Sequence, residues 1–176
     1  IAEAIKSMLV RGAGAIGAAG AYGVAQAALE AQENNFFRSV KSAAATLQST
    51  RPTAQNLFSG IAFVLEKMKA EKNAKDAKSA AVNAAQLYAD NDAESCRKIG
   101  ENGCVLIKDG AKIETHCNAG WLAFVDWGSA LSPIYAAKRH GKKVFVYVDE
   151  TRPRCQGAML TSWELLNENI AHRIIP

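Results

Sequence analysis

The 176-residue sequence has few of the residues that build disulfide frameworks, metal sites or rigid loops: four cysteines, three histidines and four prolines. The cysteines form no CxxC pair, and no cluster of cysteine and histidine has metal-ligand spacing, so we expect reduced thiols and no metal site. Lys and Arg exceed Asp and Glu by 21 to 17, but they form no run of five or six. Because the basic residues are scattered, the sequence does not predict a nucleic-acid partner. The positive net charge is equally compatible with a small anionic ligand.

The sequence also lacks the pattern of a secretory leader, and its one long uncharged stretch is poorly suited to a membrane. Residues 12–29 carry no charge, but they are mostly alanine and glycine and include Gln26, so transfer into lipid gains little. We expect a tightly packed helix there, no membrane association and a cytoplasmic location. With 49% hydrophobic and 22% charged residues, the composition is that of a globular protein rather than a disordered one.

In the first half of the chain, apolar residues recur at spacings of three and four, the period of an α-helix. The period predicts helices over residues 2–9, 16–27, 36–47, 54–68 and 79–99. The last of these is expected to end near Gly100, and Pro52 is expected in the first turn of the helix at 54–68. We therefore expect a helical N-terminal domain over residues 1–104, with its own start missing.

In the second half, the period changes to that of β-strands. Four short β-rich runs occur at residues 104–107, 112–117, 144–148 and 172–175, and helical lengths at 119–139 and 158–167 separate the last three. This alternation predicts an α/β fold, in which the helical domain is followed, over residues 105–176, by the first βαβαβ part of a Rossmann-like parallel sheet. Three parallel strands leave an open edge, so we expect a fragment whose C-terminal part is missing.

Two arginines precede predicted helices in a manner that suits phosphate. Residues 12–17 match GxGxxG formally, but the segment before them is helical, whereas a dinucleotide site needs a strand there. What remains is Arg11 followed by Gly12 at a helix start, where a guanidinium and free backbone N–H groups suit an oxyanion. A glycine-rich bend between packed helices is the alternative. Arg51 repeats the arrangement before the helix at 54–68, with a solvated arginine as the alternative.

The loop after the strand at 144–148 is the first strong candidate for chemistry. It contains Asp149, Glu150, Arg152, Gln156 and Gly157, and open α/β sheets bind their ligands at the carboxyl ends of strands. We therefore expect function in this loop.

Cys117 is the sharpest candidate in the sequence. It stands at the carboxyl end of the strand at 112–117, and the helix expected at 119–139 would point its N-terminus at the thiol, a geometry that lowers a thiol pKa. His116 is interpreted either as a group that orients the thiol or as a satisfied inward histidine. Cys96, Cys104 and Cys155 lack this placement and are expected to be small core or neighbouring residues.

Five segments together resemble the methylthioribose-1-phosphate isomerase family: residues 10–17, 51–57, 100–103, 116–120 and 149–158. The resemblance extends over nearly the whole chain. The wider family includes ribose-1,5-bisphosphate isomerase and the regulatory subunits of the translation factor eIF2B. The Cys-Asn-Ala-Gly form of residues 117–120 resembles the methylthioribose branch.

The resemblance implies an aldose–ketose isomerase of methionine salvage that interconverts 5-methylthioribose 1-phosphate and 5-methylthioribulose 1-phosphate without a cofactor. It implies that Arg11, Gly12, Arg51 and Gln156 bind this phosphorylated pentose and that Cys117 is catalytic. It further implies a homodimer. The alternatives are ribose-1,5-bisphosphate isomerase and a non-catalytic, eIF2B-like translation initiation factor regulatory subunit.

The sequence departs from the family pattern in two ways. Gly14 stands where the family usually has proline, which adds backbone freedom to the expected phosphate loop. The family's second catalytic residue, an aspartate in a Gly-x-Asp-Arg segment, has no counterpart in residues 1–176. We therefore expect a further chain or segment to carry that aspartate, and we expect residues 1–176 alone to be inactive.

Overall fold

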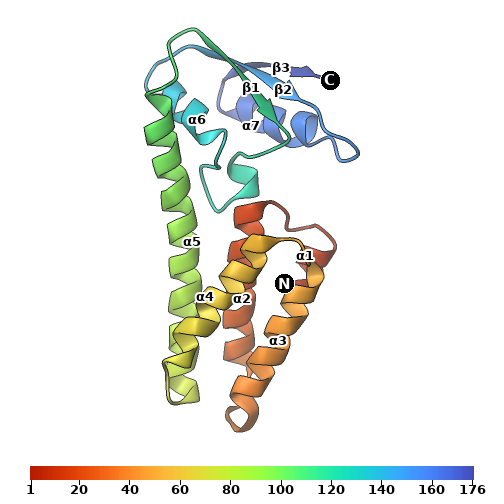
Figure 1. Ribbon diagram of the computed structural model, residues 1–176, viewed down its shortest axis with the longest axis vertical. Coiled ribbons are helices and arrows are strands. Elements are labelled where there is room, and N and C mark those ends of the chain that lie inside the picture. Colours follow the sequence, from red (N-terminus) through yellow and green to blue (C-terminus); the bar gives the residue numbers. More distant parts are fainter. The chain divides into compact units, whose positions relative to one another are not determined.

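Helices make up the first of two compact units into which the chain divides, Ile1–Asp92 and Ala93–Pro176. A computed structural model describes residues 1–176. In chain order, this unit contains α1 (Ala2–Lys6), α2 (Ala13–Glu30), the 3-10 turn η1 (Glu33–Asn35), α3 (Phe36–Thr50), α4 (Gln55–Lys69) and the start of α5 (Ala74–Cys104). Figure 1 labels these α-helices. The helical character expected for this part of the chain is confirmed, although α1 is shorter than expected and α4 begins at Gln55, after Pro52 rather than around it.

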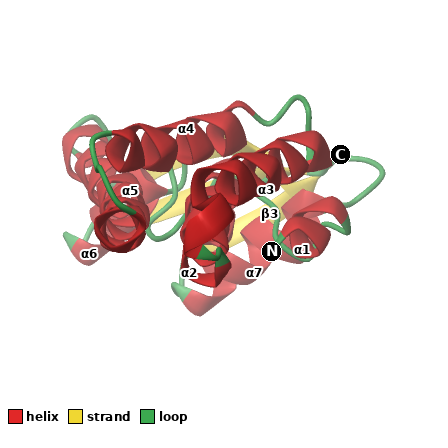
Figure 2. Cartoon of the chain, turned by 90° about the horizontal axis from the view of Figure 1, so that it is seen from below, coloured by secondary structure: helices red, strands yellow, loops and turns green.

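Apolar residues at helical spacing form the core of this unit. Leu57, Ile61 and Val64 of α4 are fully buried, and so is Val24 of α2. Figure 2 shows α2, α3 and α4 as neighbouring helices, in agreement with their contacts. The first part of α5 joins the same cluster through alanines four residues apart: Ala77, Ala81 and Ala85.

Glycines let α2 and α4 approach closely. A Cβ added at Gly60 would overlap the carbonyl oxygen of Gly17, and one added at Gly20 would lie 2.6 Å from Cδ1 of Leu57. These contacts are the close packing that the alanine and glycine of residues 12–29 predict. No helix in the structure combines the length and the apolar character needed to cross a bilayer.

Replacing Gly60 by alanine is expected to destabilise the protein by about 1–3 kcal/mol, because the new methyl group meets backbone that cannot move away. The better helix propensity of alanine, about 1 kcal/mol, offsets part of this cost. The measurement is the free energy of unfolding from urea titration, with Ser59→Ala on the exposed side of α4 as the control. Equal unfolding midpoints for the two variants would contradict the close packing.

The second unit contains a parallel sheet of three strands in the order β1-β2-β3, which are β1 (Ala111–His116), β2 (Val144–Asp149) and β3 (Ala171–Ile175). Between the strands lie the 3-10 turn η2 (Trp121–Ala123), α6 (Ser132–Arg139), the π-helical turn η3 (Gly157–Thr161) and α7 (Ser162–Asn167). Figure 1 shows α6 and α7 on the same side of the sheet. Their apolar residues form one core with Val144, Val146 and Val148 of β2. The α/β fold class, with a helical part followed by βαβαβ, is confirmed.

The strand expected at residues 104–107 is wrong. Cys104 is the last residue of α5, and Val105 and Leu106 follow in a turn, with 73% and 82% of their surface exposed. The helix does not stop at Gly100, because that glycine serves close packing: a Cβ there would overlap Oγ of Ser132. The domain boundary predicted after residue 104 coincides with the end of α5. The two compact units instead divide between Asp92 and Ala93, within this helix. The boundary stays a prediction.

The helix expected over residues 119–139 is also largely wrong. Only Ser132–Arg139 is α-helical, and the segment before it is a loop that contains η2. Trp127 and Gly128 have φ values of +65° and +75°, which end any right-handed helix and turn the chain. Residues 117–131 therefore connect β1 to α6 mostly as a loop instead of winding into a helix.

Candidate active site

Arg11 and Gly12 stand at the start of α2 in the first unit. Gly12 precedes the helix with a φ of 100°, a conformation that side chains with a Cβ rarely adopt, and its carbonyl oxygen accepts the first helical hydrogen bond from the amide of Ile16 at 2.9 Å. No side chain caps this 18-residue helix. The N–H groups of its first turn therefore suit an anion, and Arg11 adds a positive charge directly before the helix. Gly14 lies in this first turn, where proline would also be tolerated.

Arg51 follows α3 directly and precedes α4, also in the first unit. Its Nη1 atom is buried and has no hydrogen-bond partner. Burying a cationic donor without a partner is costly, and an anionic acceptor would remove that cost. Arg51 is therefore not a fully solvated arginine, and its ligand-binding role stays a prediction.

In the second unit, β1 and β2 end side by side, and each leads into a candidate segment. His116 and Asp149 are paired in the parallel register, with 3.3 Å between Nδ1 and Oδ2. The His116 side chain is 72% exposed, so it is not an inward core histidine. Cys117 follows β1 and Gln156 lies in the loop after β2, as expected for residues at the carboxyl ends of strands.

Cys117 adopts a left-handed conformation, with a φ of 60°, at the point where β1 ends. The expectation that a helix N-terminus faces its thiol is wrong, because α6 begins only at Ser132. Instead, the hydroxyl of Thr161 donates a hydrogen bond to the carbonyl oxygen of Cys117 at 2.5 Å, and it accepts one from Nδ2 of Asn118 at 3.1 Å. Thr161, at the end of η3, therefore fixes the backbone of Cys117.

The Glu164 carboxylate is a feature that the sequence analysis missed. This α7 residue has no exposed surface, and it accepts hydrogen bonds from Nδ2 of Asn118 at 2.8 Å, from the amides of Trp121 at 2.8 Å and Leu122 at 3.2 Å, and from the Tyr135 hydroxyl at 2.6 Å. Burial raises the pKa of Tyr135 well above its ordinary value of 10, and the Glu164 hydrogen bond and charge raise it further, so the phenol stays a donor. In the sequence, the only indication of this buried carboxylate was a glutamate next to Leu165 on the side of a short helix that faces the core.

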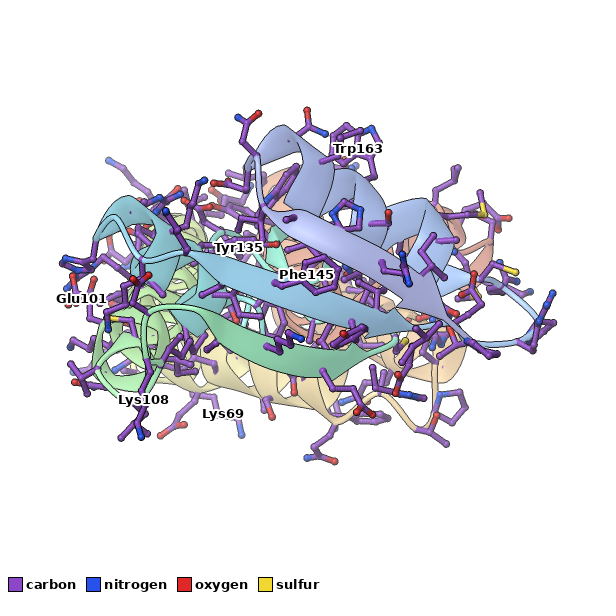
Figure 3. All side chains as sticks on the ribbon, turned by 90° about the horizontal axis from the view of Figure 1, so that it is seen from above. Lys69, Glu101, Lys108, Tyr135, Phe145 and Trp163 are labelled. Atoms are coloured by element: carbon purple, nitrogen blue, oxygen red, sulfur yellow. The ribbon has the colours of Figure 1, made fainter.

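Aromatic packing supports the same loop. Trp121 packs against Trp163 of α7 with ring centroids 5.5 Å apart and an interplanar angle of 62°. Figure 3 labels Trp163 and Tyr135, which come from the helices that follow β2 and β1. Two buried polar atoms of the loop, Oδ1 of Asn118 and Nε1 of Trp121, have no hydrogen-bond partner. The segment after Cys117 thus retains one acceptor and one donor that a polar ligand could satisfy.

The loop that carries Gln156 is organised by another carboxylate. Glu150 accepts hydrogen bonds from the amides of Thr151 at 2.7 Å, Gly157 at 3.1 Å and Ala158 at 3.3 Å. The Thr151 hydroxyl donates to Oε1 of Gln156. Because this bond engages the amide oxygen, the Nε2 group of Gln156 remains as a donor for a ligand.

The candidate residues fall into two groups. Arg11, Gly12 and Arg51 belong to the first unit, and Cys117 and Gln156 belong to the second, where neighbouring strand ends bring their loops together. The structure contains no group of three or more histidine, cysteine, aspartate or glutamate side chains placed to hold a metal ion. The second group combines a thiol with an amide donor, which suits proton transfer and hydroxyl recognition.

Comparisons with known proteins agree with this architecture. The methylthioribose-1-phosphate isomerase of Sulfurimonas denitrificans is 46% identical over an alignment of 186 positions, which covers 99% of this chain and 50% of that protein. The crystal structure of 5-methylthioribose 1-phosphate isomerase from Pyrococcus horikoshii OT3 has a TM-score of 0.91 and 35% identity, covering 99% of this chain and 50% of that one. The structure of translation initiation factor eIF-2B, subunit delta, from A. fulgidus has a TM-score of 0.88 and 45% identity, covering 99% and 52%.

The chain spans about half the length of the curated relatives that it matches. The sequence model of the initiation factor 2 subunit family matches residues 9–176. Sequence identity, family model and fold agree over almost the whole chain, and the chain therefore belongs to the initiation factor 2 subunit family.

Proposed function

We propose that the whole protein is an aldose–ketose isomerase that converts 5-methylthioribose 1-phosphate to 5-methylthioribulose 1-phosphate in methionine salvage. The observation that carries the proposal is the buried, unpaired Nη1 of Arg51, a cationic donor that a sugar phosphate would satisfy. The Cys-Asn-Ala-Gly segment after β1 and the relatives named as isomerases support the same reaction. The proposal includes a homodimer in the cytoplasm and no cofactor.

The reaction assigns a distinct task to each group. The C1 hydroxyl is blocked by phosphate, so the ring does not open by simple loss of that hydroxyl proton. The C1–ring oxygen bond breaks, the ring oxygen gains a proton, a hydrogen moves from C2 to C1, and the C2 hydroxyl loses its proton to become a ketone. Atoms and electrons balance within the sugar. The chain must therefore hold the phosphate and move protons, and it needs no external reductant.

In this proposal Arg11, the Gly12 backbone and Arg51 bind the phosphate, and Nε2 of Gln156 donates to a sugar oxygen. The Cys117 thiol carries one of the proton transfers. The second acid–base group is the aspartate that the family resemblance implies, and it comes from a further segment or chain. Steady-state kinetics of the whole protein with 5-methylthioribose 1-phosphate and with ribose 1,5-bisphosphate test the substrate. We expect a higher kcat/KM for the former, and the opposite order would favour ribose-1,5-bisphosphate isomerase.

Replacing Arg51 by glutamine is expected to lower kcat/KM for the sugar phosphate by about 10- to 100-fold, since a hydrogen bond to a charged group contributes roughly 1.5–3 kcal/mol. Most of the loss is expected in KM, because the phosphate is bound in the ground state and the transition state alike. Arg38→Gln, at an exposed position of α3, is the matched control and should leave both constants unchanged. Equal kinetics for the two variants would remove Arg51 from the site.

A regulatory, eIF2B-like role is the second candidate, because the A. fulgidus structure with 45% identity carries that name. The two functions differ in turnover. A regulator would bind a sugar phosphate or a partner without converting it, whereas the proposed enzyme forms the ketose.

A further inference from the structure

The Glu164 carboxylate is saturated with hydrogen bonds. Its Oε1 accepts from Nδ2 of Asn118 and the amide of Leu122, and its Oε2 accepts from the amide of Trp121 and the hydroxyl of Tyr135. Four donors thus fill the four lone-pair positions that two carboxylate oxygens offer. Three of these donors lie between residues 118 and 122, in the segment that directly follows Cys117, so the carboxylate determines the path of this segment.

Gly120 shows how closely the loop surrounds this carboxylate. A Cβ added at Gly120 would overlap Oε2 of Glu164 and would lie 2.5 Å from its Cδ atom. Glu164 has no exposed surface, so it does not itself touch a substrate that enters from solvent. Glu164 can therefore affect catalysis only by fixing the positions of the loop residues that donate hydrogen bonds to it.

Cys117 needs such support because of its backbone. A φ of 60° is unfavourable for a residue with a Cβ, and it persists only where neighbouring contacts enforce it. The contacts come from one side: Thr161 donates to the Cys117 carbonyl oxygen, and the Asn118 side chain bonds to both Thr161 and Glu164. The turn and helix that follow β2 thus fix the backbone that aims the thiol.

We propose that Glu164 is a positioning residue for Cys117, and that together with Thr161 it holds the left-handed backbone that aims the thiol at the substrate. The catalytic consequence rests on the proposed isomerase function. The positioning itself does not, because the direction and accessibility of a thiol are measurable without turnover.

The test uses Glu164→Gln in the whole protein. Glutamine keeps the volume, but its amide nitrogen would face donors, so part of the network is lost. Glu168→Gln, at the end of the same helix, is the matched control. We expect kcat to fall by at least about tenfold with KM changed by less than about threefold, since small displacements of a reacting group cost up to about a hundredfold. Alkylation of Cys117 by iodoacetamide, followed across pH by peptide mass spectrometry, should change at least about threefold.

Cys155 serves as an internal standard for the alkylation, because it is half-buried like Cys117 but lies after β2. Its alkylation rate should stay unchanged in Glu164→Gln. Parental kcat and parental Cys117 alkylation in Glu164→Gln would overturn the proposal. Equal changes at Cys117 and Cys155 would also overturn it, because they indicate general loosening of the fold.

If Glu164→Gln does not fold, a second pair of variants tests whether this network positions Cys117. Thr161→Val keeps the shape and removes the hydroxyl that bonds to Cys117, whereas Thr161→Ser keeps the hydroxyl. The valine variant should show the selective change in kcat and Cys117 alkylation, and the serine variant should restore both. Equal behaviour of the pair would overturn the proposal. If the parent protein shows no turnover, the isomerase proposal fails, while the alkylation of Cys117 relative to Cys155 still decides the positioning.

Discussion

Replacing Cys117 by serine in the whole protein is expected to lower kcat at least about a hundredfold, and as much as about ten-thousandfold, while the sugar phosphate still binds. A thiol has an ordinary pKa of about 8.5, whereas a serine hydroxyl is a much weaker acid and cannot exchange a proton at the same rate near neutral pH. The phosphate contacts assigned to Arg11 and Arg51 are untouched, so binding should persist. Stopped or greatly slowed turnover, together with retained ligand-induced thermal stabilisation, is the expected result.

Cys155→Ser is the control for this substitution. Cys155 is also half-buried and also follows a strand, but no role in proton transfer is assigned to it. Its replacement should leave kcat within about twofold of the parent, as surface-near substitutions without a mechanistic role usually do. Parental turnover in Cys117→Ser would show that the thiol is not the catalytic group.

Gly120→Ala is expected to be strongly destabilising, lowering the free energy of unfolding by about 3 kcal/mol or more. The new Cβ would lie 2.7 Å from Oε1 of Glu164 and would overlap Oε2. The carboxylate is fully buried and held by four hydrogen bonds, so it cannot withdraw without losing charged bonds. Urea unfolding of the whole protein measures the effect.

The control for Gly120→Ala is Gly141→Ala. Gly141 has a φ of 78°, but a Cβ there would meet nothing within 4 Å. Only the backbone strain remains, which costs about 1–2 kcal/mol. If Gly120→Ala were no more destabilising than Gly141→Ala, the packing of the loop against Glu164 would be refuted.

The sequence predicted those helices and strands in which the hydrophobic period matches the face that is buried in the structure. The apolar period of residues 54–68 predicted α4 because Leu57, Ile61 and Val64 fill one face of that helix. The alternation in 144–148 predicted β2 because every second residue enters the core. In these elements the local preference and the tertiary packing favour the same structure.

The errors arose where tertiary contacts overrode local preference. Gly100 looked like a helix stop, but it lacks a side chain because Ser132 packs against it, so α5 continues to Cys104. After Cys104, Val105 and Leu106 lie exposed in a turn, whereas Ile107 packs against the core of the second unit. Local propensity contained no information about the contact between Gly100 and Ser132.

The placement of Cys117 and Gln156 after neighbouring parallel strands was predicted from the sequence, because polar residues at strand ends gather at one edge of a sheet. Their roles in binding and catalysis stay predictions. The expected helix after Cys117 was wrong, and Glu164 was missed, for one reason. The hydrogen bonds that Glu164 accepts from the loop after Cys117 join residues more than forty positions apart, such as Asn118 and Glu164 with a separation of 46. Such pairings cannot be inferred from local spacing.

The most direct test of the central claim is the conversion of 5-methylthioribose 1-phosphate by the whole protein, followed by phosphorus and carbon NMR without added cofactor or metal. If the protein is this isomerase, the C1 acetal signal disappears and a C2 ketone signal appears while the phosphate stays on C1. Cys117→Ser should then prevent this change. An unchanged substrate spectrum with folded parent protein would show that the protein is not this isomerase.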